Sequence, residues 1–116
     1  MARVLLVEDD PDVTLVLVTA MEDAGHRIIV AATYEAAWQS LLAEPWDAVV
    51  ADVVLPGNGD GKQIADKAHQ MGIPCLVISG ALDVVAWLSE QAEYAALEKP
   101  FRVEELLQWL RTVERT

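Results

Sequence analysis

Carboxylates, a hydroxyl and an amine each follow a short apolar run in this sequence, at four places along the chain. They are Glu8, Asp9 and Asp10 after the first run, Asp52 after the third, Ser79 after the fourth and Lys99 after the fifth. Several carboxylates in one cleft repel one another and raise one another's pKa, and a hard divalent cation relieves the repulsion. Mg²⁺ in particular favours one or two carboxylates together with water and substrate phosphate.

The same set of side chains could accept a phosphoryl group. A carboxylate such as Asp52 can attack phosphorus and form an aspartyl phosphate. Mg²⁺ and Lys99 would neutralise charge on the transferred group, and Ser79 would hydrogen-bond one of its oxygens. This chemistry requires all of these residues to meet at one place in the fold.

The apolar runs that precede these residues are rich in β-branched side chains and short, which predicts strands buried on both faces. The predicted strands are Val4–Val7, Arg27–Ala31, Ala48–Ala51, Pro74–Ile78 and Ala95–Leu97. Between them the pattern changes to helical spacing. Pro11 is suited to a first helical turn, Gly25 to the end of that helix, and Thr33 to the N-cap of the next one. The predicted helices are Asp12–Ala24, Tyr34–Ala43, Lys62–Met71, Asp83–Gln91 and Val103–Glu114.

Five repeats of strand and helix predict a doubly wound, five-stranded parallel sheet with helices on both sides. Ligands of such sheets bind outside the carboxyl ends of the strands, which is where the polar residues fall. The 116 residues suffice for one domain, so we expect residues 1–116 to form one unit.

Composition excludes several classes of function. A net charge of −11 argues against binding to a nucleic-acid backbone, which needs clustered Lys and Arg. No apolar run reaches the ~20 residues that span a bilayer. Cys75 lies in an apolar run and is expected as a buried thiol, and a soluble, cytoplasmic protein fits this composition. His26 and His69 follow no ligand spacing and are expected at the surface, so a phosphoryl donor must be a partner.

Four stretches in order along the chain carry a resemblance to a known family. They are Leu6-Val7-Glu8-Asp9-Asp10-Pro11, Asp52-Val53-Val54-Leu55-Pro56, Val77-Ile78-Ser79-Gly80 and Glu98-Lys99-Pro100-Phe101. The chain resembles the receiver (CheY-like) domain of bacterial two-component response regulators, and the resemblance covers essentially the whole chain. It implies the flavodoxin-like form of the doubly wound fold.

The resemblance implies a role for each matching residue. Asp52 would be phosphorylated, Asp9 would bind Mg²⁺ (or Mn²⁺) directly, and Glu8 would assist through water. The backbone carbonyl of Val54 would be a further metal ligand. The remaining roles fall to the switch hydroxyl Ser79, to Lys99 at the phosphoryl group, and to Pro100, whose preceding peptide bond is often cis in the family.

The sequence departs from the family pattern at several positions. Pro56 and Gly61 are separated by four residues where the family commonly has three, so this loop is expected to be longer. Ala96 stands where an aromatic residue usually takes part in switching, and Arg102 where an acidic helix cap is common. The segment from Ser79 to Lys99 is short. We therefore expect a switch without an aromatic rotamer, with Trp87 repacking instead.

The resemblance also implies partners. A histidine kinase or histidine phosphotransfer protein would donate the phosphoryl group. A downstream protein would contact the face formed by the fourth helix, fifth strand and last helix. The chain would be a monomer or weak dimer. Apart from its own phosphorylation and dephosphorylation, the chain would not act as an enzyme. Two alternatives remain: a degenerate receiver that binds partners without phosphorylation, and an aspartyl-nucleophile phosphohydrolase, which wants a second acid where Val54 stands. The lack of a glycine-rich turn after the first strand excludes a nucleotide-binding Rossmann domain.

Overall fold

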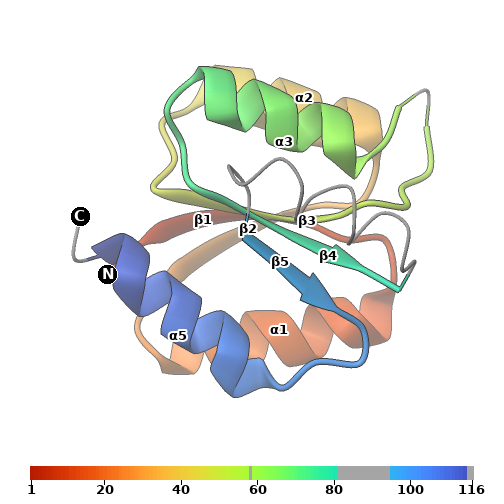
Figure 1. Ribbon diagram of the computed structural model, residues 1–116. Coiled ribbons are helices and arrows are strands. Elements are labelled where there is room, and N and C mark those ends of the chain that lie inside the picture. Colours follow the sequence, from red (N-terminus) through yellow and green to blue (C-terminus); the bar gives the residue numbers. More distant parts are fainter. Residues whose placement is uncertain (58, 81–94, 115–116) are drawn as a thin grey trace.

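Strands and helices alternate along the chain, as Figure 1 shows. The structure is a computed structural model, and it describes residues 1–57, 59–80 and 95–114. Its strands are β1 (Arg3–Val7), β2 (Arg27–Ala31), β3 (Ala48–Asp52), β4 (Cys75–Ser79) and β5 (Ala95–Glu98). Its helices are α1 (Pro11–Asp23), α2 (Tyr34–Ala43), α3 (Gly61–Gln70) and α5 (Val103–Glu114). The helix predicted over 83–91, with Trp87, lies outside the described residues.

The described strands form one parallel sheet in the order β2-β1-β3-β4-β5. The chain winds from β1 outward to β2 and then back across to β3, β4 and β5. The three strands that end in the carboxylates and the serine are therefore neighbours in the middle of the sheet. This confirms the predicted doubly wound fold and brings the predicted site residues to one edge.

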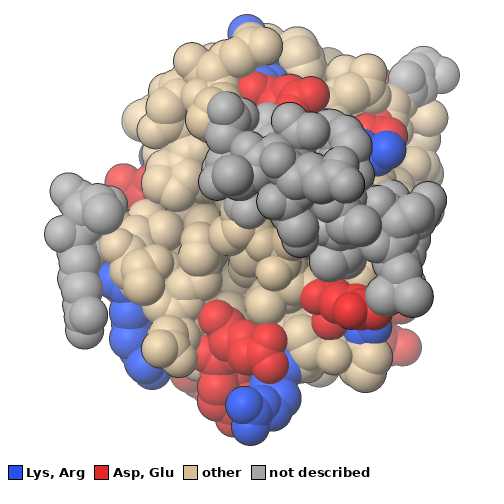
Figure 2. Space-filling view, viewed as in Figure 1, with Lys and Arg blue, Asp and Glu red and all other residues tan. Residues whose placement is uncertain are grey.

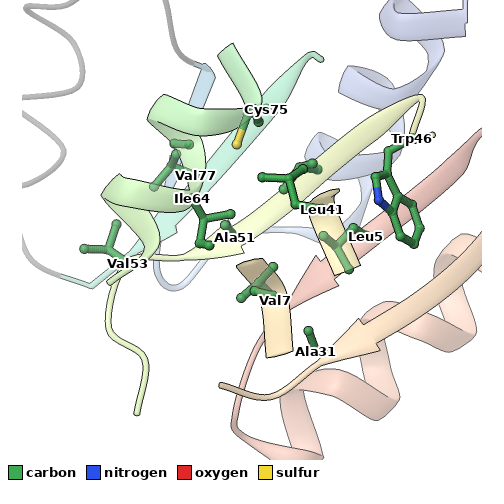
Figure 3. Close-up of a cluster of buried hydrophobic side chains, with 14 residues drawn as sticks. Leu5, Val7, Ala31, Leu41, Trp46, Ala51, Val53, Ile64, Cys75 and Val77 are labelled. Carbon is green, nitrogen blue, oxygen red and sulfur yellow. The ribbon is translucent and has the colours of Figure 1, made fainter. Parts of the chain in front are cut away.

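Helices cover both faces of the sheet, with α2 and α3 on one side and α1 and α5 on the other (Figure 1). Side chains of each strand alternate between two buried clusters. In β1, Leu5 and Val7 join the cluster on the α2/α3 side, while Val4 and Leu6 join the one on the α1/α5 side. Figure 3 shows the first cluster, in which Ile64 and Leu41 reach the sheet from their helices. Burial on both faces is why β1, β3 and β4 read as continuous apolar runs. For β2 the expectation of burial on both faces was wrong: it is an outer strand of the described sheet, and Ile29 and Val30 are exposed.

Local signals start the helices. Asp10 caps α1 by accepting bonds from the amides of Asp12 and Val13, and Pro11 supplies the first helical residue. Thr33 caps α2 as predicted. The helix α3 begins one residue earlier than predicted because Asp60 and Gln63 form a reciprocal capping box. No helix within the described part of the chain is both long and apolar enough to cross a bilayer.

The expectation of a surface position was wrong for His26, whose side chain is buried between the first residues of the chain and the end of α5. Its Nδ1 accepts a hydrogen bond of 3.1 Å from the Ala2 amide, and its Nε2 lies 3.6 Å from Glu114 Oε1. Just before it, Gly25 ends the turn after α1 with a φ of 94°, a conformation that glycine adopts readily. His69, by contrast, is exposed.

Cys75 is buried among apolar side chains, as its sequence context predicts. Burial raises the pKa of its thiol to about 12, with a smaller contribution from the charge of Asp66. The thiolate is the reactive form of cysteine, so this residue acts as a small apolar side chain at neutral pH.

Candidate functional site

Asp52 is the last residue of β3, and its carboxylate is held from two sides. The backbone amide of Val54 donates a hydrogen bond of 3.0 Å to Oδ1. The Lys99 ammonium donates one of 2.6 Å to Oδ2. The residue is only 6% exposed, so the carboxylate sits in a fixed orientation with a cation beside it.

Glu8 and Asp9 follow the end of β1, the neighbour of β3 in the sheet. Glu8 is 2% exposed and accepts a hydrogen bond of 3.1 Å from the Asp10 amide, whereas Asp9 is exposed. One carboxylate oxygen from each of Glu8, Asp9 and Asp52 lies within 4.8 Å of the others. The structure therefore brings three of the predicted residues together, while Asp10 serves as the helix cap.

The surroundings of Glu8 shift the pKa of its carboxyl group. Burial is the largest cause that raises the pKa of Glu8 from 4.5 to about 7, and the hydrogen bond to Asp52 and the charge of Asp52 add to it. The hydrogen bond from the Asp10 amide and the charge of Lys99 lower the pKa in part. The sequence led us to expect a raised pKa from repulsion between carboxylates. The larger cause is burial, which the sequence does not reveal because it depends on the folded arrangement of distant segments.

Lys99 follows β5 and reaches across the strand ends. Its amide donates to the Ser79 carbonyl at 2.9 Å, which fixes the start of the side chain, and its Nζ lies 3.8 Å from Glu8 Oε2. Burial lowers the pKa of Lys99, but the hydrogen bond and charge of Asp52, with the charges of Glu8 and Asp10, outweigh it and the pKa ends above its ordinary value. The lysine is thus a permanent cation at neutral pH. The Lys99–Pro100 peptide bond is cis.

Ser79 and Val54 complete the set of predicted residues. Ser79 is the last residue of β4, is 1% exposed, and stands beside the Asp52 segment because β3 pairs with β4 in the register Asp52↔Ile78. Val54 directs its amide to Asp52, and the residue is 71% exposed. Ala96 is half-buried and packs against the cluster on the α2/α3 side, so a small apolar group occupies the usual aromatic position.

The donor set fits a hard divalent cation. Carboxylate oxygens are the ligands that Mg²⁺ and Mn²⁺ prefer, and carboxylates crowded this closely are stabilised by a positive charge. Asp9 is exposed and Glu8 and Asp52 are buried, so a cation here would be held by protein on one side and could keep waters on the other. These residues therefore fit the group that the resemblance implies.

The chain as a whole is acidic, with 19 Asp and Glu against 8 Lys and Arg. On the face that Figure 2 shows, Lys and Arg side chains are scattered and do not gather in one patch. This visible face therefore does not present the clustered positive charge that a phosphate backbone needs.

Gly61 is a residue near the site that the sequence reasoning did not single out for a role there. It is buried, it begins α3, and its Cα faces the backbone of Asp52 and Val53. The capping pattern of Asp60 and Gln63 is the sequence signal that could have placed the helix start at this glycine.

Comparison with known proteins agrees with this geometry. Residues 4–111 match the response regulator receiver domain family. The transcriptional regulatory protein TcrA of Mycobacterium tuberculosis is 35% identical over 118 residues, which cover 97% of this chain and 46% of TcrA. The response regulator receiver protein CpdR of Brucella abortus is 32% identical over 111 residues, or 92% of each chain.

Solved structures share the fold. The response regulator protein TrrA of Thermotoga maritima, determined in complex with Mg²⁺ and BeF, superposes with a TM-score of 0.86 at 23% identity, covering 97% of this chain and 99% of TrrA. The present chain spans about half the length of TcrA, at 46%, and nearly all of CpdR, at 92%. On the match over residues 4–111, the chain belongs to the response regulator receiver domain family.

Proposed function

We propose that Asp52 accepts a phosphoryl group from a partner histidine kinase or histidine phosphotransfer protein, in a reaction that requires Mg²⁺ or Mn²⁺. One observation supports this most strongly. Asp52 is a buried carboxylate that is hydrogen-bonded to Lys99 at 2.6 Å and lies within 4.8 Å of oxygens of Glu8 and Asp9. A nucleophile, a counter-cation and a cation site are then combined at one edge of the sheet.

In the proposed step, a carboxylate oxygen of Asp52 attacks phosphorus and forms an O–P bond. The N–P bond of the donor's phosphohistidine breaks, and its electron pair leaves with the imidazole nitrogen. The Val54 amide already fixes Oδ1, so the carboxylate has little freedom to lose when the donor arrives.

Glu8, Asp9, Asp52 and the Val54 carbonyl would hold the divalent cation, which neutralises charge on the phosphoryl oxygens when it is bound. The ammonium of Lys99 would move from Asp52 to a phosphoryl oxygen, and the Ser79 hydroxyl would hydrogen-bond another. Lys99 can serve in this way because its charge, and not its packing, stabilises the transferred group.

The output would be a change in protein contacts. We place the downstream partner on the face that includes β5 and α5, and take residues 1–116 as one cytoplasmic receiver domain, monomeric or weakly dimeric. The half-buried Ala96 favours a switch that does not depend on an aromatic rotamer. A degenerate receiver would lack the assembled set of acidic residues and lysine seen here.

Intact-mass spectrometry after incubation with acetyl phosphate and Mg²⁺ tests the proposal. We expect wild type to gain the mass of one phosphoryl group, and Asp52→Asn to gain none. Asp60→Asn is the matched control, because asparagine also caps helices and Asp60 lies outside the site. Its adduct should equal that of wild type.

Two results would count against the proposal. An adduct that persists in Asp52→Asn would assign the phosphoryl group to another residue. An adduct of equal yield in EDTA would remove the need for a cation.

A further inference from the structure

Gly61 stands where α3 meets the segment that carries the phosphoryl acceptor. Its amide donates a hydrogen bond of 2.9 Å to the Val53 carbonyl, and the residue is buried. Asp60, just before it, caps the helix through the amides of Lys62 and Gln63. The Gly61–Val53 hydrogen bond therefore holds the first residue of α3 directly against residues 52–53.

A side chain at Gly61 would collide with that segment. An added Cβ would lie 2.7 Å from the Asp52 carbonyl carbon and 2.8 Å from Val53 Cα, and closer still to the Asp52 carbonyl oxygen. These are backbone atoms of a strand end, so no side-chain rotation can relieve the contact. At Gly59, the corresponding neighbours are side-chain atoms of Gln63 and Tyr34, which can rotate away once the Gln63 side chain gives up its hydrogen bond to the Asp60 amide.

The segment from Asp52 to Val54 is fastened from both sides. The Val53 amide donates to the Ile78 carbonyl of β4 at 3.0 Å, while the Val53 carbonyl accepts from Gly61. The Val54 amide in turn sets the rotation of the Asp52 carboxylate. A shift of this backbone therefore moves the carboxylate and the Val54 carbonyl together.

We propose that Gly61 is a positioning residue for phosphoryl transfer, because its lack of a side chain lets α3 seat against Asp52 and Val53 and so places the Asp52 carboxylate and the Val54 carbonyl. This inference rests on the proposed function. Groups that orient metal ligands set the affinity for the metal, so cation binding should report the displacement directly.

The test compares Gly61→Ala with two controls in the same loop. Gly59→Ala adds the same methyl group against side chains, and Asp60→Ala removes the helix cap but keeps Gly61, with its amide and its lack of a side chain. For each protein, electron paramagnetic resonance of free Mn²⁺ gives the Kd for the metal alone. Mass spectrometry gives the rate of phosphorylation by acetyl phosphate, and circular dichroism gives the melting temperature.

We expect Gly61→Ala to bind Mn²⁺ about 10- to 100-fold more weakly than wild type, which is the loss seen when a group that orients a metal ligand is removed. At the same Mn²⁺ concentration, the variant should also be phosphorylated more slowly than wild type. Saturating Mn²⁺ should restore part of the rate. Asp60→Ala should melt lower than wild type yet keep its Mn²⁺ affinity, and Gly59→Ala should match wild type in affinity. A Gly61→Ala protein that folds and binds Mn²⁺ as wild type does would overturn the inference.

Hydrogen exchange of wild type decides the matter if Gly61→Ala does not fold. Mg²⁺ should slow exchange of the Gly61 amide, which bonds to Val53, and leave that of the Gly72 amide, which bonds to His69 beyond the far end of α3, unchanged. Equal exchange at Gly61 with and without Mg²⁺ would refute the positioning role. Failure of wild type itself to bind metal and accept a phosphoryl group would instead refute the proposed function.

Discussion

Cation binding at this site should depend on pH in a range where ordinary carboxylates are already ionised. Glu8 has a pKa of about 7, raised mainly by burial, so a proton and a divalent cation compete for it near neutrality. A glutamate with the unperturbed pKa of 4.5 would show no such competition above about pH 6.

The size of the effect follows from the fraction of Glu8 that is ionised. With a pKa of about 7, roughly one molecule in eleven is ionised at pH 6 and roughly ten in eleven at pH 8. If the cation needs the ionised form, its affinity rises about tenfold over this range, or about 1.4 kcal/mol. With the ordinary pKa, the same change would be only a few per cent.

Isothermal titration calorimetry with Mg²⁺ at about pH 6, 7 and 8 measures this dependence. The matched variant is Glu8→Gln, which keeps the shape of the side chain and removes the titration, so its affinity should be weaker and nearly independent of pH. Equal affinity of wild type at pH 6 and pH 8 would show that Glu8 is ionised throughout or does not help to bind the cation. A pH dependence that survives in Glu8→Gln would assign the proton to another group.

Three further outcomes are expected. Lys99→Met should move the midpoint of this pH dependence upward, because Lys99 lowers the pKa of Glu8. An unmoved midpoint would contradict the charge argument. The same variant should keep its fold, measured by circular dichroism, but lose phosphorylation-dependent partner binding. Asp10→Ala should cost about 1 kcal/mol by removing the α1 cap, measured by urea unfolding, whereas Asp10→Asn should retain most of it. Magnesium at ten times its Kd should add about 1.4 kcal/mol, roughly 5 °C in melting temperature, and no shift relative to EDTA would argue against a cation site.

Glu8 also makes the metal-free fold depend on pH with a definite sign. Its folded-state pKa is raised, so the stability that it contributes is present below pH 4.5 and is lost as pH rises through about 7. The difference in melting temperature between wild type and Glu8→Gln in EDTA should therefore change over this range, to the disadvantage of wild type at the upper end.

Much of the fold could be predicted because the relevant signals are local. Strands buried on both faces must be apolar throughout, and caps such as Asp10 and Thr33 act on amides two or three residues away. Boundaries moved by one residue where a local signal was overlooked, as at the capping box of Asp60 and Gln63. The sequence thus specifies elements more directly than their arrangement.

The features that escaped prediction depend on contacts between distant segments. The burial of His26 depends on the start of β1 and on Glu114, which closes over it from the end of α5. The pKa of Glu8 depends on burial created by the fold as a whole. The site residues themselves could be predicted because strand ends of a parallel sheet share an edge, whereas the strand order that makes β1, β3 and β4 neighbours followed from the resemblance and not from the apolar pattern.

The strand order also means that the site residues are attached to strands that differ in how deeply they are buried. Glu8, Asp52 and Ser79 belong to or directly follow the three middle strands, whose residues are buried nearly throughout, whereas Lys99 follows β5, an edge strand with half-exposed residues. Local opening is easiest at such edges, where few buried contacts must break. The acidic residues and the serine are therefore attached to the most buried strands, and the lysine follows a strand that is less buried than those three. A signal that starts at Asp52 would leave the molecule most easily by way of Lys99 and β5.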